Sequence, residues 1–394
     1  MKTQLTSIIL PILLLTLAVS SRGAEPTDYP LAAPALLQPV PAEYADANRS
    51  FQGIPGIETD GRGGLWTTWY TRRAGDEPGA HVVLVAYSGD LGATWTEPIL
   101  AVAPSGKVRA YDPTLWRDPS GRLWLFWAQS EYEGRSWWDG RAGVWGMYTK
   151  DPERGAGASW SEPTRFCDGI MLNKPTVDKR GRILMPTSIW DVAGWRASSL
   201  THGAHVFVLD PVSLSASPLG KVEVPSELAA CDEHMIVEKQ DGSLWTWVRT
   251  LRGFGESFSS DGGKTWTELH VMDYPEHTVS RFFIRRLASG ALLLVKHGAL
   301  NDTGCGRCQL TAYLSTDDGA TWSAGLMLDE RGDVSYPDGC QDADGRIFVV
   351  WDREREGAKE ILMARFREED AAAGKFVSKD AATQIIVNKA SGND

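Results

Sequence analysis

A short strand signal that recurs six times constrains this chain more than any other feature. The pattern is Gly-x-(Leu/Ile)-(Trp/Leu/Phe), usually after an aspartate and before an apolar run. Successive copies lie 48 to 61 residues apart, and their first residues are Gly63, Gly121, Gly181, Gly242, Gly290 and Gly345. Near-even intervals of this size are typical of the four-stranded blades of a β-propeller. The sequence therefore predicts an all-β chain folded as a six-bladed β-propeller.

Each copy has the composition of a tight turn followed by a fully packed strand. Glycine adopts positive φ at a hairpin turn without a Cβ clash. The runs that follow are almost continuously apolar, as in residues 123–127 and 347–351, which indicates strands covered on both faces. One blade cannot bury both of its faces, so we expect six blades to close in a ring. A β-sandwich with chance spacing is the competing fold.

A second repeat lies between these strand signals. Residues 88–95, 259–266 and 315–322 share the form Ser-x-Asp-x-Gly-x-Thr-Trp, and residues 149–160 carry a degenerate copy. The aspartate can close the turn on backbone N–H groups, the glycine permits the bend, and the tryptophan anchors the loop in its blade. We assign these residues a structural role and no catalytic one.

Composition and charge narrow the possible partners. The 394 residues include 40 Gly, 21 Pro and 17 Trp, and helical runs of useful length are scarce, as in a turn-rich β protein. The formal net charge is −11 and no Lys/Arg-rich run occurs, which argues against nucleic acid and anionic membrane surfaces as partners. An acidic substrate stays compatible with this charge, because the local field of a site can oppose the global one.

The N-terminus has the pattern of an export signal. Lys2 precedes an apolar run over residues 8–19, and small residues follow up to Ala24. The run is shorter than the roughly 20 residues of a membrane span. We therefore expect a cleaved signal peptide over residues 1–24 and a secreted or periplasmic protein, with a membrane anchor as the alternative, and no later membrane span.

The remaining chain divides into a propeller over residues 43–370 and a C-terminal tail over residues 371–394. The tail is rich in Ala, Lys and Asp, so we expect it to be loosely held. Ring closure is expected to pair a strand near Phe51 with the last blade.

Five cysteines leave at least one thiol unpaired in a monomer. Cys305 and Cys308 form a lone CxxC, whereas a zinc site would need a second such pair or histidines at ligand spacing. We therefore expect no metal and no cofactor. A local disulfide and two free thiols are both compatible with this CxxC.

The three Ser-x-Asp-x-Gly-x-Thr-Trp boxes resemble the Asp boxes of the sialidase (neuraminidase) superfamily, over roughly residues 51–366. The chain looks like a BNR/Asp-box repeat protein similar to bacterial exo-sialidases. The resemblance implies the propeller fold strongly and activity more weakly, because propellers host many functions.

Further segments match positions of bacterial sialidases. Residues 232–249 place Glu233 at the family's catalytic glutamate and Arg249 at a substrate-binding arginine. Arg307 precedes a strand that leads into the third box and falls on a further substrate-binding arginine. Tyr336, in Val-Ser-Tyr-Pro-Asp, falls on the tyrosine nucleophile.

The chemistry of such a site explains these residue types. A free tyrosine has a pKa near 10 and is a poor nucleophile, so a carboxylate must take its proton. A neutral nucleophile avoids repulsion from a carboxylate on the anomeric carbon, and arginine grips such a carboxylate with two N–H groups. The family's acid/base aspartate lies on the loop that corresponds to residues 71–80, where we choose Asp76 over Glu77.

One segment departs from the family. Sialidases begin with Arg-Ile-Pro, whose arginine completes a triad on the substrate carboxylate, whereas Gly53 precedes Ile54 and Pro55 here. Losing such a contact should cost about 2–5 kcal/mol if nothing replaces it. Arg109, Arg141 and Arg281 are candidate replacements, and a changed substrate is the alternative.

Polar residues recur near the start of the blade-initial strands, at roughly equal distances before the glycine signals. Repeat geometry would bring them to one axial pocket, with a hydrogen bond at a blade edge as the alternative for any single member. The candidate substrate-binding residues are Asp112, Lys174, His234, Arg281 and Asp338, beside Glu233 and Tyr336. His297 ends an inner strand and can also enter the pocket.

Three functions follow from these residues. The first is a sialidase-like exo-glycoside hydrolase that cleaves a terminal acidic or polar sugar from a glycan or glycoconjugate. The second is a non-catalytic glycan-binding propeller, supported by Gly53. The third is a glycan lyase, or an altered hydrolase, that uses His234 or His297 as base.

Overall fold

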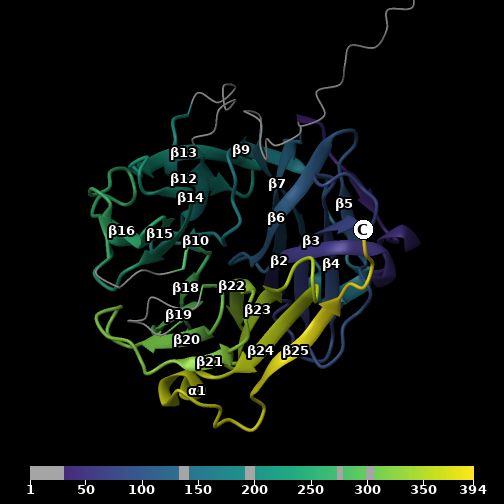
Figure 1. Ribbon diagram of the computed structural model, residues 1–394. Coiled ribbons are helices and arrows are strands. Elements are labelled where there is room, and N and C mark those ends of the chain that lie inside the picture. The colour runs from purple at the N-terminus through teal and green to yellow at the C-terminus, as the bar shows by residue number, and fades with distance from the viewer. Residues whose placement is uncertain (1–30, 133–141, 191–199, 273–277, 299–305) are drawn as a thin grey trace, which may run out of the picture.

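The computed structural model describes residues 31–132, 142–190, 200–272, 278–298 and 306–394, which form six β-sheets arranged in a ring (Figure 1). Five sheets have four strands and the first has five, and neighbouring strands within every sheet are antiparallel. The prediction of an all-β, six-bladed propeller is confirmed. The signal peptide expected over residues 1–24 lies outside the described residues.

Each blade is built from one continuous stretch of chain. Blade 1 consists of β1 (Ala35–Leu37), β2 (Arg49–Thr59), β3 (Leu65–Arg73), β4 (Val82–Ser88) and β5 (Leu100–Ala103), and blade 2 of β6 (Val108–Arg117), β7 (Leu123–Glu131), β8 (Gly143–Thr149) and β9 (Thr164–Asp168). Blade 3 consists of β10 (Thr176–Val177), β11 (Ile183–Ile189), β12 (Gly203–Asp210) and β13 (Ser215–Val222), and blade 4 of β14 (Ala229–Glu238), β15 (Leu244–Thr250), β16 (Gly253–Ser259) and β17 (His270–Val271).

Blade 5 consists of β18 (Phe283–Arg286), β19 (Leu292–His297), β20 (Leu310–Ser315) and β21 (Leu326–Asp329), and blade 6 of β22 (Val334–Gln341), β23 (Ile347–Arg353), β24 (Glu360–Phe366) and β25 (Ala382–Lys389). The helices of the described chain are short and lie between strands: η2 (Ala42–Tyr44), η3 (Asp46–Asn48), η4 (Pro152–Gly157) and α1 (Glu368–Ala373).

Each of the six glycines of the repeat occupies the turn after the innermost strand of its blade, which is β2 in blade 1. Their φ angles lie between 77° and 100°, which side chains with a Cβ rarely adopt. A Cβ at Gly242 would meet nothing within 4 Å, so the backbone conformation and not crowding requires glycine there. The turn is closed by aspartate, since Asp118 Oδ1 accepts the backbone N–H groups of Ser120 at 2.8 Å and Arg122 at 3.1 Å.

The strands after these turns are covered on both faces, as their composition predicts. The large residue of each signal is at most 4% exposed: Trp66, Trp124, Leu184, Trp245, Leu293 and Phe348. Apolar clusters extend from one blade to the next, and one of them joins residues of blades 4, 5 and 6. The hydrophobic core therefore consists of the interfaces between blades.

The three Asp boxes adopt one geometry, between β4 and β5 of blade 1, β16 and β17 of blade 4, and β20 and β21 of blade 5. Asp90, Asp261 and Asp317 each accept the backbone N–H of the box threonine at 2.8 to 3.0 Å. The box serine accepts the glycine N–H at 2.8 to 2.9 Å. These bonds close the turn locally, which fits the structural role assigned from the sequence.

The innermost strands are interrupted by β-bulges that shape the centre of the ring. The ladders shift register between Gly53 and Gly56 in β2, between Tyr111 and Thr114 in β6 and between Ser335 and Asp338 in β22. One residue inside each bulge has positive φ and precedes a proline: Ile54 at 52°, Asp112 at 49° and Tyr336 at 56°. Proline cannot donate to a ladder, so a bulge is where a strand tolerates it.

The C-terminal tail is not loosely held, so that expectation is wrong. Residues 382–389 form β25, which pairs with β24 and completes blade 6 (Figure 1). Asn388 Oδ1 also accepts a hydrogen bond of 2.8 Å from Arg49 Nη2 in blade 1. Ordering follows because the outer edge of β24 would otherwise expose unpaired backbone groups.

Ring closure also differs from the expectation. β2, which contains Phe51, pairs with β3 of its own blade and lies against blade 6 without a shared ladder. Across the seam, Gln52 N donates to Arg355 O at 3.1 Å and Gln52 Nε2 to Lys359 O at 2.6 Å. Side-chain packing and a few hydrogen bonds therefore close the ring, because blade 6 obtains its fourth strand from the C-terminus.

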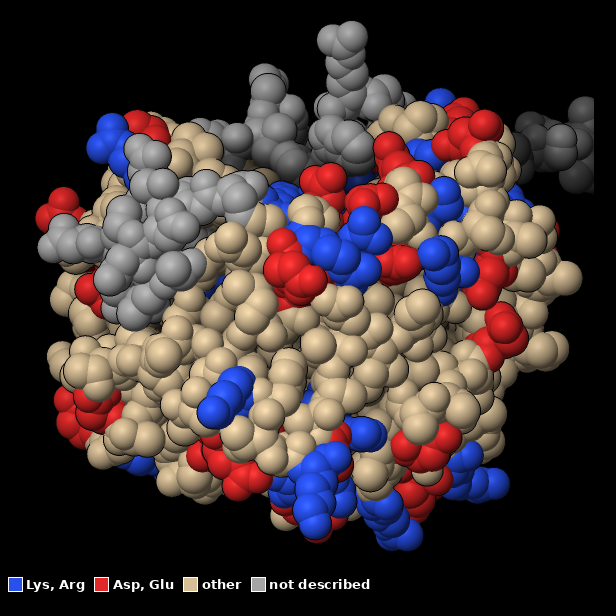
Figure 2. Space-filling model, turned by 60° about the horizontal axis from the view of Figure 1, so that its bottom comes forward, with Lys and Arg blue, Asp and Glu red and all other residues tan. Residues whose placement is uncertain are grey.

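The surface carries charges of both signs. On the face shown in Figure 2, basic and acidic side chains are interspersed, with uncharged surface between them. Within the described ranges, no helix is both long and apolar enough to span a membrane.

The order of the tail can be tested with two valine substitutions. Val387 in β25 is 6% exposed, whereas Val377, earlier in the tail, is 52% exposed. We expect Val387→Ala to lower the free energy of unfolding by about 2 kcal/mol and Val377→Ala to change it by less than about 0.5 kcal/mol. Chemical denaturation measures both, and equal small effects would mean that the tail is loose.

Candidate active site

Tyr336, Glu233 and Arg249 form a buried cluster between blades 4 and 6. Tyr336 OH donates to Glu233 Oε1 at 2.8 Å. Arg249 Nη1 lies 2.9 Å from Tyr336 OH, to which it donates, and 2.8 Å from Glu233 Oε1. The three residues are 6%, 3% and 9% exposed. The structure thus brings together three residues that the sequence analysis selected.

The electrostatic surroundings keep the tyrosine protonated. Burial raises the pKa of Tyr336 above its usual value, the charge of Glu233 raises it further, and nearby arginines, Arg249 foremost, act in the opposite direction. Glu233 Oε1 is therefore placed to accept the phenolic proton during a reaction. Glu233 Oε2 is buried and accepts no hydrogen bond from the described residues, an unusual condition for a carboxylate oxygen.

Backbone bulges aim two of these side chains. Tyr336 lies in the bulge of β22 at φ 56°, immediately before Pro337. Glu233 follows Cys231 and Asp232, whose φ angles of 67° and 46° mark the bulge of β14. Such conformations cost about 1–3 kcal/mol each and persist only where the surroundings enforce them. The two residues therefore leave the regular alternation of their strands.

A hollow of about 510 Å³ opens beside Tyr336. Arg307 and Arg355 line it, and their Cζ atoms lie 5.4 Å and 4.5 Å from the centre of the Tyr336 ring. The guanidinium of Arg307 makes no hydrogen bond or ion pair with the residues that the structure describes. The other lining residues are Phe51, Asp333, Ser335, Glu354, Glu356 and Gly357.

Arg355 is a site residue that the sequence analysis missed. It follows β23 in the turn to β24, outside the repeated positions from which the candidates were drawn. The only signal in the sequence is an arginine shortly after the last buried strand, in Trp-Asp-Arg-Glu-Arg. The repeat register would not have found it, because Arg249 stands seven residues after Gly242 and Arg355 stands ten after Gly345.

Asp112 is a second titratable group of the cluster. It is 6% exposed and lies in the bulge of β6. Burial raises the pKa of Asp112 to about 7, the charge of Glu233 adds to this, and Arg109, Arg355 and Arg281 oppose it. A carboxyl group whose pKa lies near neutrality can both give and take a proton at physiological pH.

Asp76, which the sequence analysis chose as acid/base, lies in a different environment. Its carboxylate accepts hydrogen bonds from Arg73 Nε at 2.8 Å and from Arg73 Nη2 at 3.1 Å. Arg73 also pairs with Glu43 at 2.8 Å and lies over the ring of Tyr44. The structure therefore engages Asp76 in an ion pair with its own loop and does not bring it to Tyr336.

Lys174, Arg281 and Asp338 form a buried network where the inner strands converge. Lys174 Nζ lies 3.1 Å from Asp338 Oδ2 and donates to Ile57 O at 2.6 Å. Arg281 donates to Asn173 Oδ1 at 2.7 Å and lies 3.3 Å from Asp338 Oδ1. The three predicted substrate-binding residues do meet, but burial and mutual pairing make them a structural link between blades.

His234 and His297 are buried and held by backbone carbonyls. His234 Nε2 lies 2.8 Å from His205 O, and His297 Nδ1 lies 3.2 Å from Cys308 O. Burial lowers the pKa of His234 to about 4 and that of His297 to about 3. Both imidazoles are thus neutral and weak bases at pH 7, which gives the lyase alternative no support.

Two of the arginines that could replace the side chain missing at Gly53 are engaged elsewhere. Arg109 lies over the ring of Tyr111 in its own blade, with Cζ 3.8 Å from the ring centre. Arg281 belongs to the network with Asp338. The third candidate, Arg141, lies outside the described residues.

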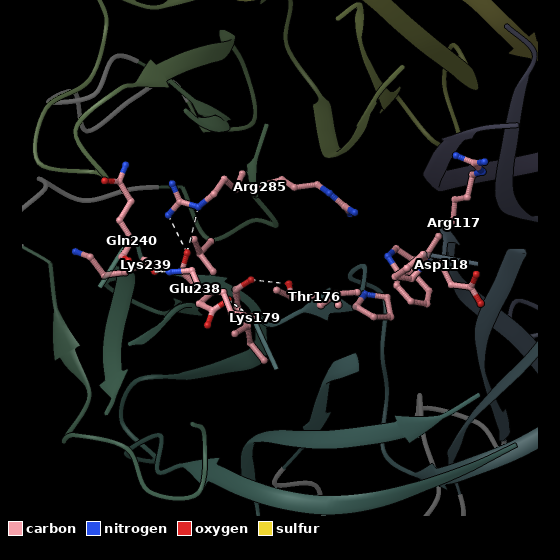
Figure 3. A pocket seen from close by; sticks show the side chains of 15 residues that line it. Arg117, Asp118, Thr176, Lys179, Glu238, Lys239, Gln240 and Arg285 are labelled. Carbon is pink, nitrogen blue, oxygen red and sulfur yellow. Dashed lines mark hydrogen bonds between the residues drawn. The ribbon is translucent and has the colours of Figure 1, made fainter. Parts of the chain in front are cut away.

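A second hollow, of about 550 Å³, opens at the other end of the inner strands (Figure 3). Its carboxylates are already occupied: Asp118 Oδ2 accepts Trp124 Nε1 at 3.0 Å, and Glu238 Oε2 accepts Lys179 N at 2.7 Å. Arg285 extends into the hollow, but no tyrosine, histidine or cysteine lines it. In its described lining, this hollow therefore has no counterpart of the hydrogen-bonded pair that Tyr336 and Glu233 form.

The structure describes four of the five cysteines. Cys308 is disulfide-bonded, and Cys167, Cys231 and Cys340 are free thiols. Among the residues that the structure describes, no three His, Cys, Asp or Glu side chains are grouped as metal ligands would be.

Comparisons with known proteins agree with the architecture. A family model described as a BNR repeat-like domain matches residues 63–349. No curated protein matches the chain. A protein of unknown function from Dyadobacter fermentans superposes with a TM-score of 0.59 at 18% identity, covering 83% of this chain and 95% of that chain.

Two similar structures are described as enzymes on sialic acids. A Hadza microbial sialidase has a TM-score of 0.60 at 20% identity, and the match covers 76% of this chain and 63% of the sialidase. The intramolecular trans-sialidase from Ruminococcus gnavus, in complex with oseltamivir carboxylate, has a TM-score of 0.61 at 15% identity and coverages of 85% and 97%. At these identities the likeness shows a shared fold.

The raised pKa of Asp112 predicts a pH-dependent stability. An aspartate in the unfolded chain has a pKa of about 3.9, so the folded state binds more protons between about pH 4 and 7 and is destabilised as the pH rises through that window. The free energy of unfolding of Asp112→Asn minus that of wild type should therefore rise between about pH 4 and pH 8, by at most about 4 kcal/mol.

Urea denaturation over this pH series measures the effect. Glu77→Gln, which removes one exposed acid from the loop of Asp76, is the control and should follow the wild-type profile. Parallel profiles of wild type and Asp112→Asn would show that this carboxyl group titrates normally.

Proposed function

The chain belongs to the BNR repeat-like domain family, and we propose on that premise that it is a secreted exo-glycoside hydrolase of the sialidase type. Its substrate is a terminal acidic or polar sugar of a glycan or glycoconjugate. The observation that carries the proposal is the 2.8 Å hydrogen bond from Tyr336 OH to Glu233 Oε1, beside a hollow lined by arginines. Export by the signal over residues 1–24 is part of the proposal.

Tyr336 is the nucleophile in this mechanism. Sialidases use a tyrosine where most glycosidases use a carboxylate. As the phenolic oxygen bonds to the anomeric carbon, its proton passes to Glu233, so no free phenolate has to form beforehand. Arg249 donates to the phenolic oxygen and contacts Glu233, and it thereby stabilises the charge that moves between them.

The leaving oxygen needs a proton in the same step, and Asp112 supplies it. Asp112 is partly protonated at neutral pH, since its pKa is raised to about 7, and Glu233 is among the charges that raise it. Asp76 is less suited, because its carboxylate is held in a bidentate pair with Arg73. The glycosidic bond breaks as the proton reaches its oxygen, and the aglycone leaves.

The second half of the reaction reverses these roles. The Asp112 carboxylate takes a proton from water, and the water oxygen attacks the anomeric carbon. The bond to Tyr336 breaks, and Glu233 returns the proton to the phenolic oxygen. Arg307, whose guanidinium has no counter-ion among the described residues, binds a carboxylate of the sugar through both steps.

The nucleophile assignment is tested by Tyr336→Phe. We expect kcat/KM on aryl glycosides of N-acetylneuraminic, glucuronic and galacturonic acids to fall by more than about 100-fold, because the attacking oxygen is lost and the ring is kept. Release of the chromogenic aglycone measures the rate. Tyr87→Phe is the matched control, because Tyr87 OH also donates to a carboxylate, Asp60 Oδ2 at 3.0 Å. This pair belongs to blade 1 and does not line the hollow.

The outcomes separate the competing functions. A Tyr336→Phe variant with the wild-type rate would contradict the nucleophile. Saturable sugar binding by wild type without product at any pH would identify a glycan-binding propeller. A product with the absorbance of an unsaturated uronate would identify a lyase.

The acid is tested by changing the leaving group. Asp112→Asn should slow alkyl glycosides by about 100-fold or more, because a poor leaving group needs the proton, and should slow 4-nitrophenyl glycosides much less. The ratio of the two kcat/KM values is the readout. If Asp76→Asn changed this ratio and Asp112→Asn did not, the acid would be Asp76.

A further inference from the structure

The backbone at Gly53 passes directly against the side chain of Arg355. A Cβ at Gly53 would lie 2.7 Å from Arg355 Cδ and 2.8 Å from both Cγ and Nε, distances that real Cβ atoms do not show. The φ angle of Gly53 is outside the left-handed region, so crowding and not backbone conformation requires glycine here. Arg355 of blade 6 therefore fills the volume that a side chain at position 53 of blade 1 would occupy.

Buried groups fix Arg355 in this place. Its Nε donates to Asp352 Oδ2 at 2.9 Å, and its Nη2 donates to Ser335 Oγ at 3.1 Å. Asp352 is fully buried, and its Oδ2 also accepts Ile54 N at 2.7 Å in the bulge of β2. These bonds use two of the five N–H groups of the guanidinium. The side chain is 21% exposed and lines the hollow beside Tyr336, so the remaining donors can meet a ligand.

The arginines around Tyr336 differ in whether a carboxylate of the protein pairs with them. Three arginines surround the tyrosine, namely Arg249, Arg307 and Arg355. Glu233 pairs with Arg249 and Asp352 pairs with Arg355, but Arg307 has no ion-pair partner among the described residues. Arg307 is thus the one of these three arginines without an ion pair in the described part of the chain, and a carboxylate of a sugar can pair with it.

The acidic residues of the hollow restrict where that carboxylate can lie. Asp333, Glu354 and Glu356 line the same hollow and would repel an anion. Glu354 is engaged with its own turn, since its Oε2 accepts Ala358 N at 3.0 Å. A carboxylate is therefore favoured only against the arginines that flank the Tyr336 ring.

We propose that Arg355, which reaches the site across Gly53, is a substrate-binding residue that grips the carboxylate of an acidic sugar together with Arg307. The absence of a side chain at Gly53 then leaves the space that Arg355 occupies. The inference rests on the proposed function and deepens it, because it assigns the specificity for an acid to an arginine of blade 6.

The test measures how strongly the site prefers a carboxylate over its methyl ester. Isothermal titration calorimetry is run with N-acetylneuraminic acid and D-galacturonic acid and with the methyl ester of each. Wild type should bind one of the acids at least about 30-fold more tightly than its ester. Arg355→Lys should reduce the affinity for the acid about tenfold and leave the ester unchanged, since lysine lacks the planar fork.

An exchange of positions makes the test specific. Gly53→Arg alone should weaken binding of the acid, because two side chains would compete for one volume. Gly53→Arg combined with Arg355→Ala should bind the acid more tightly than Arg355→Ala alone. Arg331→Lys is the matched control, since Arg331 also pairs with a buried aspartate, Asp329 at 2.7 Å, and does not line the hollow.

The possible results distinguish this inference from the proposed function. The inference would be overturned if the folded Arg355→Lys variant and the variant with both Gly53→Arg and Arg355→Ala each kept the wild-type ratio of acid to ester affinity. This holds even if glycosides are hydrolysed. No preference for either acid by wild type would also overturn it. A preference that depends on Arg355 in a protein that hydrolyses no glycoside would support the inference and contradict the hydrolase.

Discussion

The site depends on inner strands that leave their regular ladder at one point. Ile54, Asp112 and Tyr336 adopt positive φ before a proline, at a cost of about 1–3 kcal/mol each. Buried carboxylates of blade 6 hold one of these bulged strands, β2, at two points: Asp352 accepts Ile54 N, and Asp338 accepts Ile57 N at 2.9 Å. Packing between blades keeps the strands in place. At the bulges, the side chains of Asp112 and Tyr336 therefore depart from the alternating directions of a regular strand.

Pairing of charges determines what this centre can do. Glu233 is close enough to Tyr336 to hold its proton, and burial keeps that proton on the phenol until a substrate arrives. The same negative charge helps to keep Asp112 partly protonated. In the proposed mechanism, one glutamate thus sets up both a neutral nucleophile and an acid, as a sugar that carries its own carboxylate requires.

The sequence predicted what repeats and missed what does not. The glycine turns, the Asp boxes and the inward positions of Glu233 and Tyr336 follow from local rules that recur in each blade, whereas Arg249 was selected through the resemblance to sialidases. Repeat register says that a residue points inward but not whether others seal it off, so Lys174 and Asp338 could not be recognised as a structural link. Arg355 lies in a turn, and its contact with Gly53 joins the first and last blades, which no local pattern encodes.

The proposed mechanism requires that Tyr336 bond to the sugar during turnover. An activated glycosyl fluoride of an acidic sugar, bearing a second fluorine that slows the release step, should accumulate the intermediate. Mass spectrometry of the intact protein and of its peptides then locates the added mass. We expect one sugar bound to the peptide that contains Tyr336, and no such adduct in Tyr336→Phe. A stable adduct on another residue, or substrate consumption without any adduct, would contradict it.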